Sequence, residues 1–184
     1  KCFKQMKDKN VCPDEVTYVC ILKACGIVGS LEIGMDINAE VRNNGLLEKY
    51  FVLGNALVEM YSKCGELKKA QAVFEGIPIR DVVAWNAVIA GYGQSGHGNL
   101  ILDIYNRMRT EDVVPNLATF NVLLNACSHS GLLDKGQHFF WSMKYFGIIA
   151  TLEHYTCMVD LFGRAGLVEK AVTLINNIPI FDHL

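Results

Sequence analysis

The sequence predicts an all-α protein, built as a right-handed α-solenoid of stacked helix-turn-helix hairpins, and three observations predict it. A helical pattern of apolar residues recurs five times, a glycine follows each copy at a fixed distance, and a second helical segment follows each glycine. A single hairpin of this kind exposes an apolar face that it cannot bury alone, so neighbouring copies are expected to stack and bury it together.

The first helix of each hairpin is predicted from apolar residues three, four and seven positions after a starting residue, which share one face of an α-helix. The starting residue is aromatic in four copies and glycine in the second. The copies are Tyr18/Ile21/Leu22/Cys25, Gly54/Leu57/Val58/Tyr61, Trp85/Val88/Ile89/Tyr92, Phe120/Leu123/Leu124/Cys127 and Tyr155/Met158/Val159/Phe162.

The turn of each hairpin is predicted from a glycine eleven residues after the starting residue, because glycine readily adopts the left-handed conformation that ends a helix. These glycines are Gly29, Gly65, Gly96, Gly131 and Gly166. The fifth residue of the second helix is small in four copies, which allows paired helices to approach closely. These residues are Gly34, Ala70, Gly136 and Ala171, with Ile101 as the exception. Second helices are expected to end near Pro13, Pro78, Pro115 and Pro179.

Composition limits the possible functions. The 184 residues are 51% hydrophobic and carry a formal net charge of −2, so the chain has enough apolar residues for a core but no overall charge that attracts nucleic acid. Its apolar runs are too short to span a membrane. The cysteines are odd in number, lie mostly in helical patterns and form no CxxC pair, which predicts reduced, buried thiols. Lys1 opens within a helical pattern, so we expect a fragment of a longer protein.

The phrases GNALVEMYSKCGELKKAQAVFEGIPIRDVVAWNAVIAGYGQSG and LEHYTCMVDLFGRAGLVEKA, in hairpins of about 35, 36 and 31 residues, resemble the PLS subclass of pentatricopeptide-repeat (PPR) proteins of plant organelles. The resemblance covers essentially the whole of 1–184 as a single array. It divides the chain into the end of a P repeat, an L, an S, a P, an L and a final S repeat, at 1–14, 15–50, 51–81, 82–116, 117–151 and 152–182.

This resemblance implies that each repeat faces one nucleotide of single-stranded RNA and reads it with two side chains, the one after the starting residue and the last of the repeat. The first of these lies about 100° around the helix from the core stripe, at its border. The reading residues it implies are Asn55, Asp81, Asn86, Asn116, Asn121, Thr156 and Asp182.

The implied preferences differ between repeats. Asn55 with Asp81 resembles a uracil-reading pair, and Asn86 with Asn116 a pyrimidine pair that leans to cytosine. Thr156 with Asp182 would resemble a guanine reader, although His183 is an alternative second residue. No base is assigned to the L-type repeats. In the first of them the repeat-end partner of Val19 is Lys49 or Tyr50, and in the second the partner of Asn121 is Thr151.

Two further sets of positions are implied to contact RNA. Aliphatic residues two before the starting residue would sandwich the bases, and Glu153 breaks this pattern. They are Val16, Val52, Val83 and Ala118. Polar residues nine after it are candidate phosphate contacts. They are Lys63, Gln94, His129 and Arg164.

Plainer interpretations exist for the same residues. Asparagine near a helix start often caps the helix, and Lys63 and Arg164 are equally consistent with ordinary solvated charges. Cys127 and His129 are the closest cysteine and histidine pair, but Cys127 lies on the core stripe and no metal-binding spacing accompanies it, so no metal or other cofactor is expected. No GxSxG, GxxxxGK or zinc-deaminase motif is present, so no catalytic residue and no small-molecule substrate are expected.

The function expected from the resemblance is sequence-selective binding of single-stranded RNA in a mitochondrion or plastid, without membrane association. Arrays of this subclass usually precede a C-terminal extension in C-to-U RNA-editing factors, so editing-complex proteins are expected partners and any deaminase would lie outside this chain. Roles in RNA stabilisation, splicing or ribosomes would use the same residues. The alternative from another class is a protein-interaction solenoid.

Overall fold

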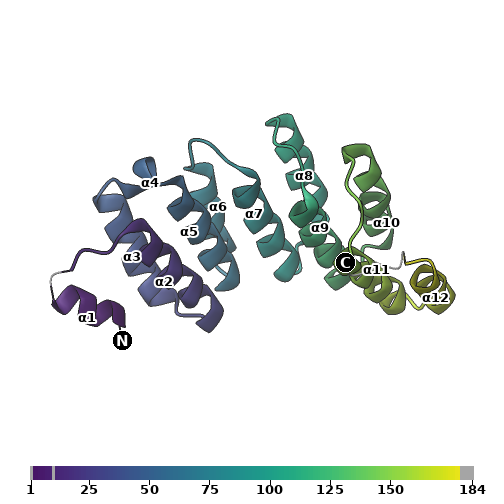
Figure 1. Ribbon diagram of the computed structural model, residues 1–184, viewed down its shortest axis with the longest axis horizontal. Helices are drawn as coiled ribbons and strands as arrows, with labels where there is room; N and C mark the ends of the chain where they lie inside the picture. Colours follow the sequence, from purple (N-terminus) through teal and green to yellow (C-terminus); the bar gives the residue numbers. More distant parts are fainter. Residues whose placement is uncertain (1, 10, 179–184) are drawn as a thin grey trace, which may run out of the picture. The chain divides into compact units, whose positions relative to one another are not determined.

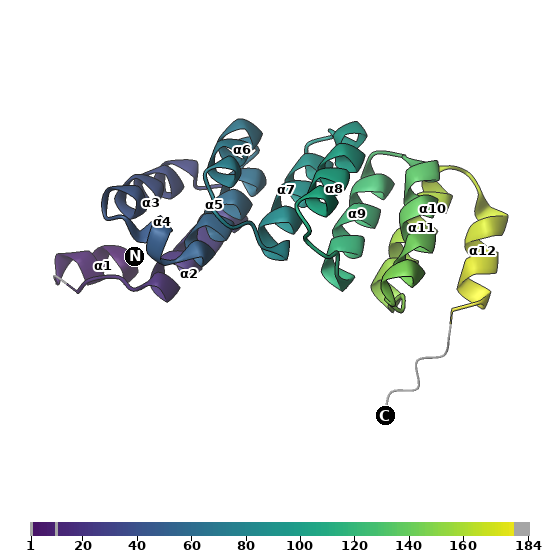
Figure 2. The same ribbon diagram turned by 90° about the horizontal axis from the view of Figure 1, so that it is seen from above.

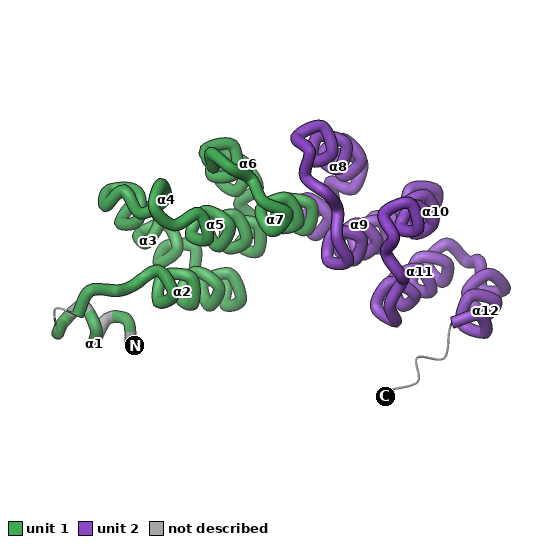
Figure 3. Tube along the Cα trace, turned by 45° about the horizontal axis from the view of Figure 1, so that its top comes forward, with its two compact units in different colours: residues 1–91 green, residues 92–184 purple. Residues whose placement is uncertain are grey.

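The computed structural model describes residues 2–9 and 11–178, and every regular element among them is helical (Figure 1). The helices gather into two compact units, residues 1–91 and 92–184 (Figure 3). The prediction of an all-α protein made of helical hairpins is confirmed.

The first unit holds two complete hairpins, which pair α2 (Glu15–Val28) with α3 (Leu31–Asn43) and α5 (Phe51–Lys63) with α6 (Leu67–Glu75). Helix α1 (Cys2–Asp8) precedes them, and a four-residue helix, α4 (Leu46–Lys49), connects the two hairpins. Helix α7 (Val82–Gln94) begins in this unit and ends in the second. The first helices α2 and α5 lie side by side (Figures 1 and 2).

The second unit repeats this arrangement. A short 3-10 turn, η1 (Gly98–Leu100), leads into α8 (Ile101–Thr110), and α9 (Leu117–His129) pairs with α10 (Leu133–Ser142). A second 3-10 turn, η2 (Met143–Phe146), extends α10, and α11 (Leu152–Arg164) pairs with α12 (Val168–Asn176). The first helices α9 and α11 pack directly on each other (Figure 2).

The turn glycines all have the predicted left-handed backbone. Their φ values are 69° at Gly29, 78° at Gly65, 77° at Gly96, 65° at Gly131 and 72° at Gly166. The amide after each glycine then reaches back to the last helical turn, as when the Leu132 amide donates to the Cys127 carbonyl at 2.9 Å. A side chain at a positive φ is strained, so glycine fixes the hairpin turn at these positions.

The core of each unit combines residues of the predicted apolar stripes with large apolar residues of the second helices, such as Phe74 and Phe139. In the first unit Leu22 and Leu57 are fully buried, and the rings of Phe74 and Trp85 meet edge to face at 4.7 Å between centroids. In the second unit Phe120 and Phe139 are fully buried. Burial of about 25 cal/mol per Å² of apolar surface is the main stabilising contribution that these contacts make.

The small residues predicted on the second helices do sit at close contacts. A Cβ at Gly34 would lie 2.5 Å from Met60 Sδ, and one at Gly136 would overlap the side chain of Leu161. Both neighbours belong to the first helix of the next hairpin, so small size here lets consecutive hairpins stack. Ile101, the exception, is itself fully buried.

Among residues 2–9 and 11–178, no helix has both the length and the apolar character needed to cross a membrane. The sequence did not predict α4 or either 3-10 turn. They occupy the stretches around Gly45, Gly98 and Gly147, where the helical pattern of apolar residues is interrupted.

Two glycines at the same place in their hairpins give a test of this packing. A Cβ at Gly93 would meet the Ala126 backbone at 3.0 Å, whereas one at Gly163 would meet nothing within 4 Å. Gly93→Ala is therefore expected to lower the free energy of unfolding by about 1–3 kcal/mol, because the contact is already full. Gly163→Ala should raise it by roughly 0.5–1 kcal/mol, because alanine favours the helix. Urea unfolding followed by circular dichroism measures both, and equal effects would contradict the packing described.

Candidate nucleic-acid interface

The first of the two implied reading residues of four repeats lies in the first turn and a half of the first helix. Asn55 is on α5, Asn86 on α7, Asn121 on α9 and Thr156 on α11. Their burial differs, since Asn55 is only 8% exposed and Thr156 is fully on the surface. The contacts of each residue therefore decide what it can offer to a base.

Asn55 and Asp81 are brought together by the fold. Asn55 Nδ2 donates to both carboxylate oxygens of Asp81, at 3.0 and 3.2 Å. The same carboxylate accepts the Ala84 amide at 2.9 Å and so caps the start of α7. Because the amide nitrogen of Asn55 is held by Asp81, its Oδ1 is the atom that remains to accept a hydrogen bond from a base.

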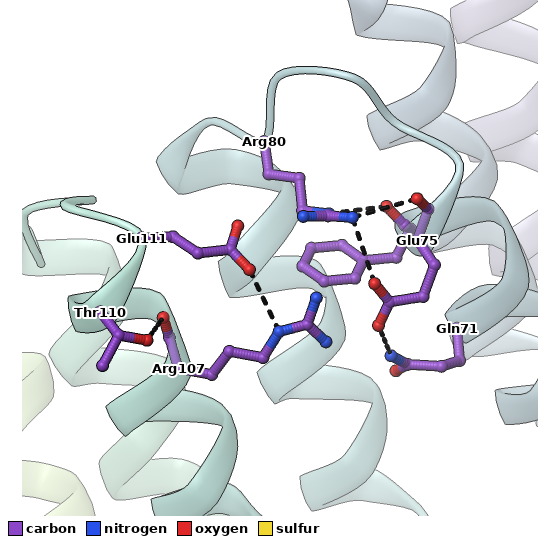
Figure 4. A network of polar contacts seen from close by, with 7 residues as sticks. Gln71, Glu75, Arg80, Arg107, Thr110 and Glu111 are labelled. Carbon is purple, nitrogen blue, oxygen red and sulfur yellow. Dashed lines mark hydrogen bonds and ion pairs between the residues drawn. The ribbon is translucent and has the colours of Figure 1, made fainter.

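Arg80 anchors the segment that carries Asp81 (Figure 4). Its guanidinium donates to the carbonyls of Phe74 and Glu75, both at 3.0 Å, and to the Glu75 carboxylate at 3.1 Å. It also lies over the Phe74 ring, 5.0 Å from the centroid. Gln71 holds the other side of the same carboxylate. Arg80 thus satisfies the open carbonyls at the end of α6 and fixes the turn before Asp81.

In the second unit, the end of α8 is held by local contacts (Figure 4). Arg107 pairs with Glu111 at 3.1 Å, and the Thr110 hydroxyl donates to the Arg107 carbonyl at 2.8 Å. Asn116 caps the next helix, α9. Its side-chain oxygen accepts hydrogen bonds from the amide and the hydroxyl of Thr119, each at 3.0 Å. The plainer interpretation, capping, thus holds for Asn116, although this role uses only its side-chain oxygen.

Asn86 and Asn116 belong to different units. The Asn86 side chain is half-buried, and its Oδ1 is buried without a hydrogen-bond partner among the described residues. Such an atom is costly in a folded protein. It marks Asn86 as a side chain whose hydrogen-bonding capacity the protein itself leaves unused.

Asn121 meets a partner that the sequence did not predict. Its Nδ2 donates to Glu153 Oε2 at 2.8 Å, and Glu153 comes from the start of α11 in the next hairpin. Thr151, the last residue of the Asn121 repeat, instead forms a capping box with His154 at the start of α11. The residue that breaks the aliphatic pattern is therefore the hydrogen-bonding partner of Asn121.

A cavity of about 410 Å³ lies between the starts of α9 and α11. Its walls combine the implied sandwiching, reading and repeat-end positions of adjacent hairpins. They are Leu117, Ala118, Asn121, Thr151, Leu152, Glu153 and His154. This volume is in the range of small-molecule binding sites.

His154 is a buried residue in the lining of this cavity. Its side chain is 1% exposed, its Nδ1 lies 3.2 Å from the Thr151 amide and its Nε2 lies 3.0 Å from the Leu117 carbonyl. A backbone amide only donates and a carbonyl only accepts, so the neutral ring with its hydrogen on Nε2 satisfies both. The sequence did not predict this role for His154, although Thr-x-x-His has the spacing of a capping box.

The implied sandwiching residues are exposed, as contact with bases requires. Val16 is 61% exposed, Val52 38% and Val83 54%, and Ala118 is also exposed.

Thr156 donates to the Leu152 carbonyl at 2.8 Å within its own helix. Its implied partner Asp182 and the alternative His183 lie outside the described residues.

The candidate phosphate contacts are mostly engaged with their own helices. Lys63 pairs with Glu59 at 2.6 Å and Arg164 with Asp160 at 2.8 Å, while His129 Nδ1 lies 2.8 Å from the Asn125 carbonyl. Gln94 is exposed. A hydrogen bond from Ser128, together with Arg164, holds the pKa of Asp160 below its ordinary value. Paired carboxylates reduce the positive potential that these cations present to a phosphate.

The six cysteine thiols that the structure describes are free, but not all of them are buried. Cys25, Cys127 and Cys157 are buried and Cys64 is half-buried, whereas Cys12 and Cys20 are exposed, so the prediction of buried thiols is wrong for those two. Cys20 is on the solvent side of α2, and Cys12 lies outside any helix. Among the described residues, no three His, Cys, Asp or Glu side chains are grouped as a metal site would require.

Comparison with known sequences gives a consistent family. The profile described as "PPR repeat family" matches residues 80–148, the "Pentatricopeptide repeat domain" profile matches 1–47, and the "PPR repeat" profile matches 55–81 and 153–179. A putative mitochondrial pentatricopeptide repeat-containing protein of Arabidopsis thaliana is 41% identical over 97% of this chain. Another Arabidopsis pentatricopeptide repeat-containing protein is 44% identical over 96%. This chain spans only 29% and 33% of their lengths.

Solved structures share the fold. The pentatricopeptide repeat protein PPR10, in complex with an 18-nucleotide psaJ RNA element, aligns with a TM-score of 0.74 over 94% of this chain and 26% of its own, at 19% identity. The PPR domain of Arabidopsis protein-only RNase P 1, in complex with tRNA, aligns with a TM-score of 0.58 over 83% of both chains, at 14% identity. At these identities the likeness concerns the fold alone.

The thiol environments predict a labelling order. Burial raises the pKa of Cys127 to about 12 and that of Cys157 to about 11, whereas Cys12 and Cys20 are exposed. The thiolate is the reactive form, so iodoacetamide at pH 8 should modify Cys12 and Cys20 first and Cys127 only on unfolding. Peptide mass spectrometry after timed labelling measures the order. Early labelling of Cys127 in the folded protein would contradict the packing of α9.

Proposed function

We propose, from the premise that this chain belongs to the pentatricopeptide-repeat family, that its hairpins bind single-stranded RNA and read one base per repeat. The observation that carries the proposal is the hydrogen-bonded pair Asn55 and Asp81, in which the fold joins the two positions implied to read a base. The RNA complexes of PPR10 and of the RNase P domain support RNA as the ligand class.

The chemistry of this pair favours uracil. Asp81 holds the amide nitrogen of Asn55, so Oδ1 remains as the acceptor for a base. Uracil has a hydrogen on N3 that can donate to this oxygen, whereas N3 of cytosine has only a lone pair. The exposed Val52 and Val83 lie on the consecutive first helices α5 and α7. They would provide apolar surface for the faces of the base. Direct hydrogen bonding and stacking then act on the same nucleotide.

The parent protein is proposed to recognise C-to-U editing sites in a mitochondrion or plastid. The succession of L, S, P, L and S repeats at 15–50, 51–81, 82–116, 117–151 and 152–182 supports this subclass, and one relative of similar sequence is named as mitochondrial. In this proposal the array supplies recognition, and editing-complex proteins supply the chemistry. Sandwiching by Val16 and Ala118, and phosphate contact through Lys63, Gln94, His129 and Arg164, are parts of the same proposal.

A second candidate, binding of a partner protein, is favoured by exposed aromatic residues. Trp141 is 61% exposed on α10, and Tyr145 is 79% exposed one turn later. Both belong to the second half of their hairpin, whereas the reading residues belong to first helices. A protein bound there would leave the RNA-reading ends accessible, so the two functions are compatible.

Exchange of one reading residue tests base recognition. The resemblance implies that threonine with aspartate reads guanine, so Asn55→Thr should move the preference opposite this hairpin from uracil to guanine, by roughly tenfold in relative Kd. Fluorescence anisotropy with short RNAs at fixed salt measures the preference, and circular dichroism checks the helices. Asn106→Thr, on the exposed face of α8, is the control that should change nothing. An unchanged preference in a folded Asn55→Thr protein would sink the assignment.

Salt dependence tests the phosphate contacts separately. Each phosphate neutralised by a cation contributes about 0.9 in DNA, and about 0.7 on a single strand, to the slope of log K against log salt. The double variant Lys63→Gln with Arg164→Gln should therefore reduce the slope by roughly 1.4 while leaving base preference intact. Titrations from low to moderate salt measure it. If the slope stays at the wild-type value, Lys63 and Arg164 are only solvated charges.

A further inference from the structure

Two asparagines on equivalent positions of their first helices are each held by a carboxylate, but the carboxylates come from different places in the sequence. Asn55 is held by Asp81, the last residue of its own repeat, at 3.0 Å. Asn121 is held by Glu153, the second residue of the following repeat, at 2.8 Å. The 117–151 repeat ends in Thr151, which has no carboxylate.

The orientation of the Asn121 amide is set by its whole surroundings. Its nitrogen donates to Glu153, while its oxygen lies 3.4 Å from the donor Asn125 Nδ2 and 3.6 Å from the thiol of Cys157. Burial and the nearby Asp160 and Glu153 raise the pKa of Cys157 to about 11, so this thiol carries its hydrogen at neutral pH. The amide therefore points its nitrogen at Glu153, as that of Asn55 points at Asp81.

Glu153 brings its carboxylate to a cavity that is otherwise largely apolar. The apolar part of the lining of this cavity of about 410 Å³ consists of Leu117, Ala118 and Leu152. The Glu153 side chain is exposed. Only Glu153 Oε2 is engaged by Asn121, which leaves Oε1 able to accept a further hydrogen bond. Within residues 11–178, no Lys or Arg forms an ion pair with Glu153.

We propose that Glu153 is the second base-reading residue of the 117–151 repeat, and that this cavity selects bases with a hydrogen on the ring nitrogen of their pairing edge. This inference rests on the proposed RNA-binding function and assigns a preference to a repeat that the sequence leaves without one. A carboxylate only accepts hydrogen bonds. Uracil N3 and guanine N1 carry a hydrogen to donate, whereas cytosine N3 and adenine N1 present a lone pair that a carboxylate repels.

The same position in other repeats cannot do this. Val52 and Val83 stand where Glu153 stands, and a valine side chain offers apolar contact but no acceptor. Glu153 therefore combines two places of the repeat pattern: it sits at a sandwiching position and performs the hydrogen bonding of a repeat-end residue. The specificity of one hairpin then depends on a residue of the next.

The test measures base preference at two positions of one RNA. Short RNAs with each nucleotide varied are titrated by fluorescence anisotropy into the 184-residue chain at fixed salt. The nucleotide that responds to Asn55→Thr marks the 51–81 repeat, and the nucleotide two positions away faces the 117–151 repeat. There the wild type should bind uracil and guanine roughly tenfold more tightly than cytosine and adenine. A uracil methylated on N3 should lose this advantage.

Two variants of Glu153 and one control variant distinguish a specific role of its carboxylate from a general effect of net charge. Glu153→Gln keeps the shape and should raise cytosine to the level of uracil, because an amide both donates and accepts. Glu153→Val, the residue of other repeats, should remove discrimination at this position. Glu169→Gln changes the net charge equally on the exposed face of α12 and should leave the preference unchanged.

The outcomes distinguish this inference from the function on which it rests. If the position facing 117–151 shows no preference, or if both Glu153 variants keep the wild-type preference, while the position facing 51–81 still discriminates, the role of Glu153 is overturned alone. If neither position discriminates in a folded, RNA-binding chain, base reading by this array is overturned as well.

Discussion

The packing of consecutive first helices is the constraint on which the candidate site depends. One hairpin cannot bury its apolar stripe, so α5 packs beside α2, and α11 beside α9. Glycines and other small residues set how close these helices come, as at Gly34 against Met60. The same packing aligns the beginnings of neighbouring first helices. Polar side chains from two hairpins then meet in the pairs Asn55–Asp81 and Asn121–Glu153, and a cavity forms where α9 and α11 begin.

Carboxylates and hydroxyls at these junctions serve the fold and the site together. Asp81 caps α7 and also orients Asn55. Thr151 and His154 cap α11, and His154 also contacts the Leu117 carbonyl in the preceding hairpin. Capping makes these side chains rigid, and a rigid hydrogen-bonding group discriminates between bases better than a mobile one. Arg80 adds to this by fixing the turn that carries Asp81. Capping and the proposed base reading are therefore compatible at Asp81.

Periodicity was enough to predict the hairpins, because burial depends on which residues share a helix face. It also placed the five left-handed glycines, from Gly29 to Gly166, since few other residues accept that backbone. It did not predict the bond between Asn121 and Glu153, because a contact between residues 32 apart depends on how two helices stack. Exposure of Cys12 and Cys20 was missed for a related reason: an apolar residue type near a helical stripe need not lie on it.

Photo-crosslinking tests most directly whether RNA lies along the beginnings of the first helices. RNAs that carry 4-thiouridine at successive positions are bound to the chain and irradiated, and mass spectrometry identifies the crosslinked peptides. The account predicts crosslinks to peptides from the first turns of α5, α7, α9 and α11, moving by one hairpin for each nucleotide. Crosslinks concentrated on α6, α10 and α12, or independent of the position of the 4-thiouridine, would contradict it.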